Sequence, residues 1–176
     1  MRRVNVTGTS SSGKTTFARA LGERLGLQVI ELDALHWEAD WTEAPEAVMR
    51  ERVRATLAGT DGWVVDGNYS VTRDLVWERV DTVVWLDFGL PVILRRFARR
   101  TARRIRSQEE LWPGTGNSES LRQHLDPRTS LLWWILTTYR RRRREYPRLF
   151  AARPDIRVIR LRSPAEARRW LDELGR

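Results

Sequence analysis

One short stretch constrains this chain more than anything else in its sequence. Residues 8–15 read Gly-Thr-Ser-Ser-Ser-Gly-Lys-Thr, which fits the pattern G-x-x-x-x-G-K-[ST]. A β-like run, Val4–Val6, precedes the stretch, and apolar residues with helical spacing follow it from Phe17 to Leu25. In the order strand, glycine-rich loop and helix, backbone N–H groups and a helix N-terminus converge on phosphate oxygens. The stretch therefore predicts a polyphosphate-binding loop, the alternative being an ordinary Gly/Ser turn before a helix.

The chemistry of phosphate and metal binding explains the residue types in this loop. The glycines let backbone amides point inward, and the ammonium group of Lys14, the only lysine in the chain, can reach the β- and γ-phosphates of a nucleotide. The hydroxyl of Thr15 can bind Mg²⁺. We therefore expect ATP and Mg²⁺ as cofactors. The residues expected to bind the nucleotide phosphates are Gly8, Thr9, Ser10, Ser11, Ser12, Gly13, Lys14, Thr15 and Thr16.

The rest of the chain alternates strand-like and helix-like segments. Short apolar runs predict strands at 27–32, 63–65, 82–86 and 156–161. Helical spacing predicts helices at 45–58, 72–79, 91–106, 130–146 and 164–174. This alternation is typical of a single α/β domain over residues 1–176, a three-layer sandwich with a five-stranded parallel sheet. Most tryptophans are expected in its core, among them Trp63, Trp85, Trp133 and Trp134.

Charge is distributed unevenly along the chain. The net charge of +9 divides into −4 for residues 1–90 and +13 for residues 91–176. A basic half attracts phosphates, nucleic acid or an anionic surface, although the preference for arginine over lysine also fits a coding bias. No apolar stretch is long enough to cross a membrane, the first residues lack the apolar core of a secretory signal, and cysteine is absent. We therefore expect a cytoplasmic protein without a membrane partner or disulfides.

Several stretches together resemble a known family. Besides residues 8–16, these are Glu31–Trp37, Val64–Tyr69, Trp85–Asp87 and Tyr139–Leu149. The chain resembles the nucleoside monophosphate kinases, and within them the small adenylate-kinase-related proteins labelled DNA topology modulation proteins. The resemblance implies a P-loop NTPase fold with a helical lid at about 107–128, where Pro and Gly indicate loop structure.

The resemblance also implies roles for single residues. Val65-Asp66-Gly67 resembles the strand-end Asp-Gly whose carboxylate holds Mg²⁺ through water, so the expected metal residues are Thr15 and Asp66. An ordinary Asp-Gly turn is the alternative.

Two arginine-rich segments resemble the arginine sets of adenylate kinases. In the first, one arginine stacks on adenine and a second, four residues later, contacts phosphate, which selects Arg95 and Arg99 on one helical face. The alternative is a solvated basic face. In the second, 140–144, the arginines that neutralise the transferred group are expected among Arg140, Arg141 and Arg144.

The acceptor side departs from the adenylate kinase pattern. Where those enzymes have Asp-Gly-Phe-Pro-Arg, this chain has Asp-Gly-Asn-Tyr-Ser at 66–70. Asp33 is expected at the end of the second strand, facing the acceptor. As a base it implies an alcohol acceptor, whereas as a partner of the magnesium site it allows a phosphate acceptor. His36 and Trp37 follow and could line the same pocket, His36 alternatively being a surface loop residue.

These observations predict a kinase that transfers the γ-phosphoryl group of ATP to a small acceptor, with nucleoside monophosphates among the candidates. Its expected catalytic set consists of Lys14, Asp33 and the five arginines above, and its partners are ATP and the small-molecule acceptor. The alternative is a nucleic-acid-binding protein that uses ATP as a regulator, which the basic half favours. A nucleotide hydrolase or switch is a weaker third interpretation.

Overall fold

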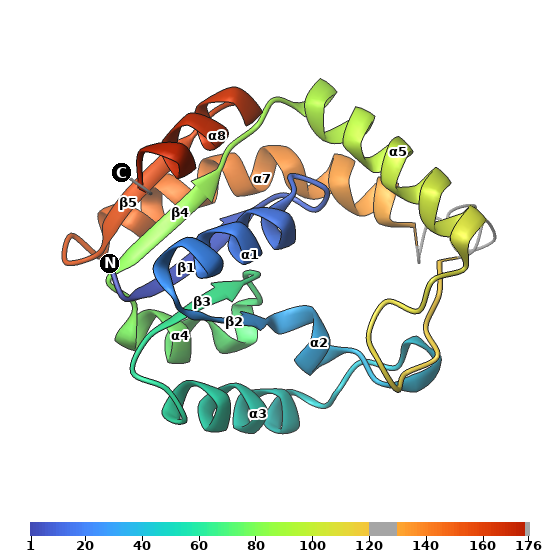
Figure 1. The fold of residues 1–176 in the computed structure, drawn as a ribbon, viewed down its shortest axis with the longest axis horizontal. Coiled ribbons are helices and arrows are strands. Elements are labelled where there is room, and N and C mark those ends of the chain that lie inside the picture. The colour runs from blue at the N-terminus through green and yellow to red at the C-terminus, as the bar shows by residue number, and fades with distance from the viewer. Residues whose placement is uncertain (120–129, 175–176) are drawn as a thin grey trace.

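A five-stranded parallel sheet forms the centre of the molecule (Figure 1). The computed structural model describes residues 1–119 and 130–174, so the end of the expected lid-like insertion lies outside the described residues. The strands lie in the order β2-β3-β1-β4-β5, and each neighbouring pair is parallel. Their bounds are Arg3–Gly8 for β1, Gln28–Glu31 for β2, Trp63–Asp66 for β3, Thr82–Leu86 for β4 and Arg157–Leu161 for β5.

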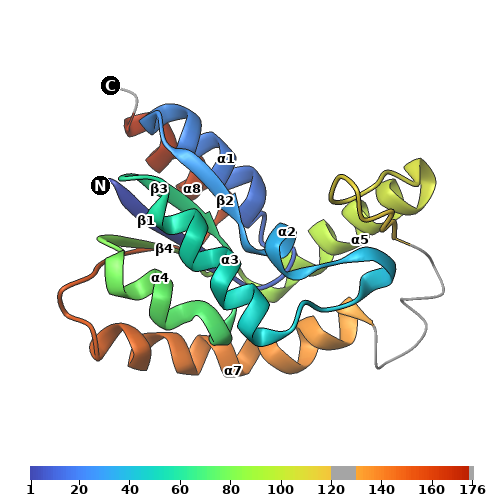
Figure 2. The same cartoon turned by 90° about the horizontal axis from the view of Figure 1, so that it is seen from below.

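Helices cover both faces of this sheet (Figure 2). On one face lie α1 (Lys14–Leu25) and α8 (Pro164–Glu173). On the other lie α3 (Glu46–Ala58), α4 (Arg73–Arg79) and α7 (Leu131–Ala151). Successive strand residues alternate between the two cores, since Val64 packs with α1 and Val65 packs with α3 and α4. The three-layer α/β sandwich and its five-stranded parallel sheet are therefore confirmed.

The strand order creates a ligand position beside β1. From β1 the chain runs through α1 to β2 on one side, and from β3 it crosses to β4 on the other. In such sheets, ligands bind beyond the carboxyl ends of the strands where the chain changes direction. Three elements lead away from this edge: loop 9–13, α2 (Leu32–His36) and α5 (Leu90–Ser107).

Three features differ from the sequence-based expectations. The helix expected at 130–146 continues to Ala151 through Pro147, because Tyr146 and Phe150 on either side pack against Trp85. Asp33 does not end a strand: β2 stops at Glu31, and Asp33 lies in the first turn of α2.

The third correction concerns two tryptophans at the start of α7. Trp63 and Trp85 are in the core, as expected, but Trp133 and Trp134 are 56% and 46% exposed, so their assignment to the core is wrong. Helical period explains the error, because Ile135 and Tyr139 lie on the buried side of α7, whereas positions 132–134 and 136 are exposed. Among the described residues, none of the helices combines the length and apolarity that crossing a membrane needs.

Candidate active site

The loop at residues 8–13 wraps around the start of α1. Gly13 has φ +89, a left-handed conformation that favours glycine, and its missing Cβ would lie 2.6 Å from the Nη1 atom of Arg96. The Ser12 amide donates to the Thr9 carbonyl at 3.1 Å, which closes the loop. The side-chain hydroxyls of Ser11 and Ser12 are buried and have no hydrogen-bond partner among the residues that the structure describes. Polar groups buried in this way call for a ligand that accepts hydrogen bonds, as phosphate oxygens do.

Lys14 is held at the centre of this loop. Its Nζ atom donates to the Thr9 carbonyl at 3.4 Å. Burial lowers the pKa of Lys14, while the carboxylates of Asp66 and Asp33 oppose that shift. The guanidinium groups of Arg142 and Arg100 lower the pKa of Lys14 further. Charged groups from four different elements, two carboxylates and two guanidinium groups, therefore act electrostatically on the single ammonium group of the loop.

The half-buried Thr15 and the buried Asp66 form a hydrogen-bonded pair beside Lys14. The Thr15 Oγ1 atom donates to Oδ2 of Asp66 at 2.5 Å, and Asp66 is 5% exposed at the end of β3. Burial raises the pKa of Asp66 from 3.8 to about 6, although Lys14 and Thr15 act in the opposite direction. The second carboxylate oxygen, Oδ1, is buried and accepts no hydrogen bond from residues 1–119 or 130–174. A hydroxyl and a carboxylate with a free oxygen suit the oxygen-based coordination of Mg²⁺.

Asp33 lies across from the loop on α2. It is exposed, and the Tyr69 hydroxyl donates to its Oδ1 atom at 2.7 Å. Burial raises the pKa of Tyr69 well above its ordinary value, so the phenol keeps its proton and remains a donor to Asp33. His36 is a buried residue of α2 whose ring lies 4.6 Å from that of Tyr69, centre to centre, and burial lowers its pKa. The His36 imidazole is therefore part of the support of the Asp33–Tyr69 pair, and its alternative assignment to a surface loop is wrong.

The arginines next to the loop are neighbours of those selected from the sequence. On α5, Arg96 donates through Nη1 to the Ser12 carbonyl, and the next residue on the same helical face is Arg100. Arg95 and Arg99 are exposed on an adjacent face of α5. The match to the adenylate kinase segment thus differs by one residue from the face that points inward.

The second arginine set shows the same kind of offset. Arg142 on α7 donates to the Gly8 carbonyl at 3.4 Å. Arg140, Arg141 and Arg144 are exposed and line a surface hollow of about 510 Å³ on the same helix. A straight helix turns by about 100° per residue, so five consecutive arginines cannot share one face.

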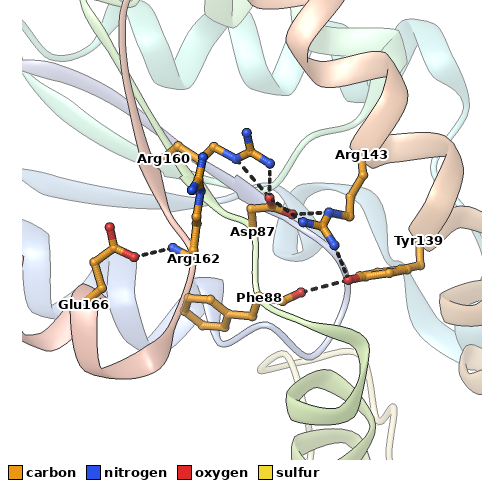
Figure 3. Close-up of polar contacts among 7 residues, drawn as sticks. All are labelled: Asp87, Phe88, Tyr139, Arg143, Arg160, Arg162 and Glu166. Carbon is orange, nitrogen blue, oxygen red and sulfur yellow. Dashed lines mark hydrogen bonds and ion pairs between the residues drawn. The ribbon is translucent and has the colours of Figure 1, made fainter.

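An ion-pair network fixes the position of α7 (Figure 3). Asp87, which follows β4, accepts from Arg143 on α7 at 2.9 Å and from Arg160 on β5 at 2.6 Å. The Tyr139 hydroxyl accepts from Arg143 at 2.8 Å and donates to the Phe88 carbonyl at 3.4 Å. Because the ion pair with Asp87 fixes Arg143 next to the carboxyl end of β4, the adjacent Arg142 is held next to the phosphate loop.

Sequence reasoning missed four residues of this arrangement: Tyr69, Arg96, Arg100 and Arg142. The signal for Arg96 and Arg100 was present in the apolar pattern of α5. Ile93 and Phe97 face the core, and the residues one helical turn apart at the edge of that face are Arg96 and Arg100. Nothing in the sequence pairs Tyr69 with Asp33, since the contact depends on how α2 meets the loop after β3.

Comparison with known proteins gives the family and the fold of this chain. A family model described as an AAA domain matches residues 4–120, more than half of the chain. The chain belongs to this AAA domain family. A comparison of the AAA domain chain with curated proteins finds no match.

Among solved structures, this AAA domain protein is similar to several kinases. A sugar kinase from Janibacter sp. HTCC2649 is 22% identical, with a TM-score of 0.52 and coverage of 99% of this chain and 90% of that one. A gluconokinase from Sinorhizobium meliloti 1021 is 20% identical, with a TM-score of 0.52 and coverage of 99% and 93%. A shikimate kinase from Acinetobacter baumannii, in complex with shikimate, is 18% identical, with a TM-score of 0.57 and coverage of 99% and 90%. At these identities the likeness shows the fold, which is the α/β P-loop NTPase fold.

Proposed function

We propose that this protein is an ATP-dependent phosphotransferase that acts on a small-molecule acceptor. The observation that carries the proposal is the cluster of Lys14, Thr15 and the buried Asp66 beneath a loop whose Ser11 and Ser12 hydroxyls have no hydrogen-bond partner among the described residues. The loop amides and Lys14 bind the β- and γ-phosphates, and Thr15 and Asp66 hold Mg²⁺, which neutralises phosphate charge when bound. Arg96, Arg100 and Arg142 take the phosphate-contacting roles for which the sequence suggested their neighbours.

The acceptor is proposed to be an alcohol. Asp33 has an exposed carboxylate oriented by the Tyr69 hydroxyl, and it lies close enough to Lys14 for their charges to interact. A carboxylate so placed can accept the proton of an attacking hydroxyl or hold that hydroxyl in line with the γ-phosphate. Kinases named for sugar, gluconate and shikimate substrates share the fold, and each of those substrates is a polyol. A nucleoside monophosphate is the second acceptor class, which the resemblance to adenylate kinases suggests.

An acceptor screen with labelled ATP tests this proposal. Sugars, sugar acids, small alcohols, nucleosides and nucleoside monophosphates are each incubated with the protein and Mg²⁺, and transfer of label is measured. We expect transfer to a hydroxyl compound, lost in Lys14→Ala and reduced in Asp33→Asn. Wild-type transfer by Lys14→Ala would refute the assignment, and transfer only to nucleoside monophosphates would refute the alcohol acceptor.

Matched arginine variants test which faces of α5 and α7 contribute to phosphoryl transfer. Arg96→Ala, Arg100→Ala and Arg142→Ala each remove an inward group, and each is expected to lower kcat by about 10²- to 10³-fold. Arg95→Ala, Arg99→Ala and Arg141→Ala are the controls one residue away, and they should stay within about twofold of wild type, because removing one exposed charge changes the site little. If the outer variants lose activity and the inner ones do not, the inward assignment is wrong.

Nucleic-acid binding is the second candidate function, favoured by one surface. Arg140, Arg141, Arg144 and Arg148 are exposed on one side of α7, and none of them makes an ion pair with a described residue. Such groups bind phosphate backbones with a steep salt dependence. Titration of duplex DNA at physiological salt distinguishes the candidates. Tight binding that is lost in an Arg140→Ala/Arg144→Ala variant, without turnover on any acceptor, would favour this second function.

A further inference from the structure

The segment after α5 returns to the segment after α2. In Figures 1 and 2 the loop of residues 108–119 lies beside the chain that follows α2. Asn117, which is 2% exposed, makes the contact: its Nδ2 atom donates to the Glu38 carbonyl at 2.8 Å, and its Oδ1 atom accepts from the Trp41 amide at 2.9 Å. The buried Asn117 side chain thus forms two hydrogen bonds between segments that are far apart in sequence.

Three indole rings pack around the same junction. Trp112 lies 6.3 Å from Trp37 with nearly parallel planes, and 5.7 Å from Trp41 with perpendicular planes, measured between ring centres. Trp37 and Trp41 are 5.6 Å apart. Aromatic pairs in these arrangements attract one another beyond the burial of their area. We call Trp37, Trp41, Trp112 and Asn117 the clasp.

Two residues beyond Asn117, the chain reaches the phosphate side. The carboxylate of Glu119 is 6% exposed and contacts Arg104 at 2.7 Å and Arg100 at 3.6 Å. The Nε and Nη2 atoms of Arg100 are buried and make no hydrogen bond within the described residues. The guanidinium group of Arg100 therefore has N–H donors available for a phosphate ligand, while the Glu119 carboxylate balances its positive charge. The charge of Arg100 also acts on Lys14 and on Asp33. The stretch 117–119 therefore joins the acceptor side of the site to its phosphate side.

We propose that Asn117 and Glu119 are positioning residues, which act through Arg100 to align it with Lys14 when the clasp is closed. The proposal rests on the proposed phosphotransferase function and adds a coupling to it. The segment that carries Trp37 begins directly after His36, which packs on Tyr69, the partner of Asp33. The clasp therefore connects the acceptor side of the site, at Asp33 and Tyr69, to the position of Arg100.

A double-mutant cycle tests whether these residues act through Arg100. Asn117→Ala and Glu119→Gln are each expected to lower kcat about tenfold, with KM for ATP changed less than twofold. In an Arg100→Ala background, neither substitution should lower kcat further, because the group through which they act is absent. The control is Glu109→Gln, an exposed carboxylate on the same segment, and it should match wild type. Independent, multiplicative losses in the Arg100→Ala background would overturn the proposal.

Limited proteolysis tests the clasp without any measurement of catalysis. Trypsin cleavage after the arginines of 99–106 should be several-fold faster in Asn117→Ala than in wild type or Glu109→Gln, because the opened clasp releases the end of α5. Equal cleavage rates would overturn the clasp, even if the kinetics changed. If wild type transfers phosphate to no acceptor while Asn117→Ala still accelerates cleavage, the clasp stands and the proposed function fails.

Discussion

The raised pKa of Asp66 gives a prediction about stability that is independent of any ligand. In the folded protein this carboxyl group titrates at about 6, whereas its ordinary value is 3.8. Between these values the folded state binds a proton that the unfolded state has released, so raising the pH destabilises the fold. From pH 4.5 to pH 7 the resulting loss in the free energy of unfolding is about 2 kcal/mol for this one group.

Asp66→Asn removes this titration. The amide oxygen of the variant still accepts a hydrogen bond from the Thr15 hydroxyl, and a weaker bond there lowers the stability equally at every pH and leaves its slope unchanged. Without the Asp66 carboxylate, the pKa of Lys14 in the folded variant is lower than in wild type. A group that loses a proton on folding makes stability rise with pH, so this change acts in the same direction as the predicted difference. The variant's free energy of unfolding, minus that of wild type, should therefore increase by about 2 kcal/mol from pH 4.5 to pH 7.

Urea denaturation at half-unit pH steps measures this difference. The m-values must agree between the two proteins for the comparison to hold. Parallel stability curves, within about 0.5 kcal/mol across the window, would show that Asp66 is not desolvated as the structure indicates. A difference that shrinks with pH would refute the reasoning outright.

Three further predictions concern the loop, the network and the core. Gly13→Ala should cost about 1–2 kcal/mol, because φ +89 strains any residue with a Cβ, and it should displace Arg96 and weaken Mg²⁺·ATP binding in calorimetry. Asp87→Asn should lower the free energy of unfolding by about 1–3 kcal/mol, since two guanidinium groups lose a charged acceptor, and unchanged stability would argue against the network as an anchor. Ile135→Ala should cost about 2–5 kcal/mol in urea denaturation, whereas Leu136→Ala, at a 43% exposed neighbour, should cost less than about 0.5 kcal/mol.

Much of the fold could be predicted because its signals are local. The strands at 63–66 and 82–86 are short apolar runs, and the helix after the phosphate loop has a clear apolar face. The alternation of strands and helices along the chain predicts a parallel sheet. The phosphate loop, with Lys14 and Thr15, needs only its own residues and the elements on either side of it.

The rest of the site depends on helical phase and on contacts between distant segments. Counting arginines in 95–106 does not show which of them face the loop, and a shift of one residue separates Arg96 from Arg95. Trp133 looks like a core residue by type, yet its position on α7 turns it outward. The partners of Asn117 lie 76 and 79 positions away, at Trp41 and Glu38, and no local pattern indicates them.

Calorimetric titration with Mg²⁺·ATP tests the central claim most directly, because the whole site depends on the loop around Lys14. We expect saturable binding at one site in wild type, and loss of the binding heat in Lys14→Met with the fold retained by circular dichroism. The absence of binding heat in wild type, or equal binding by Lys14→Met, would contradict a polyphosphate site built on this loop.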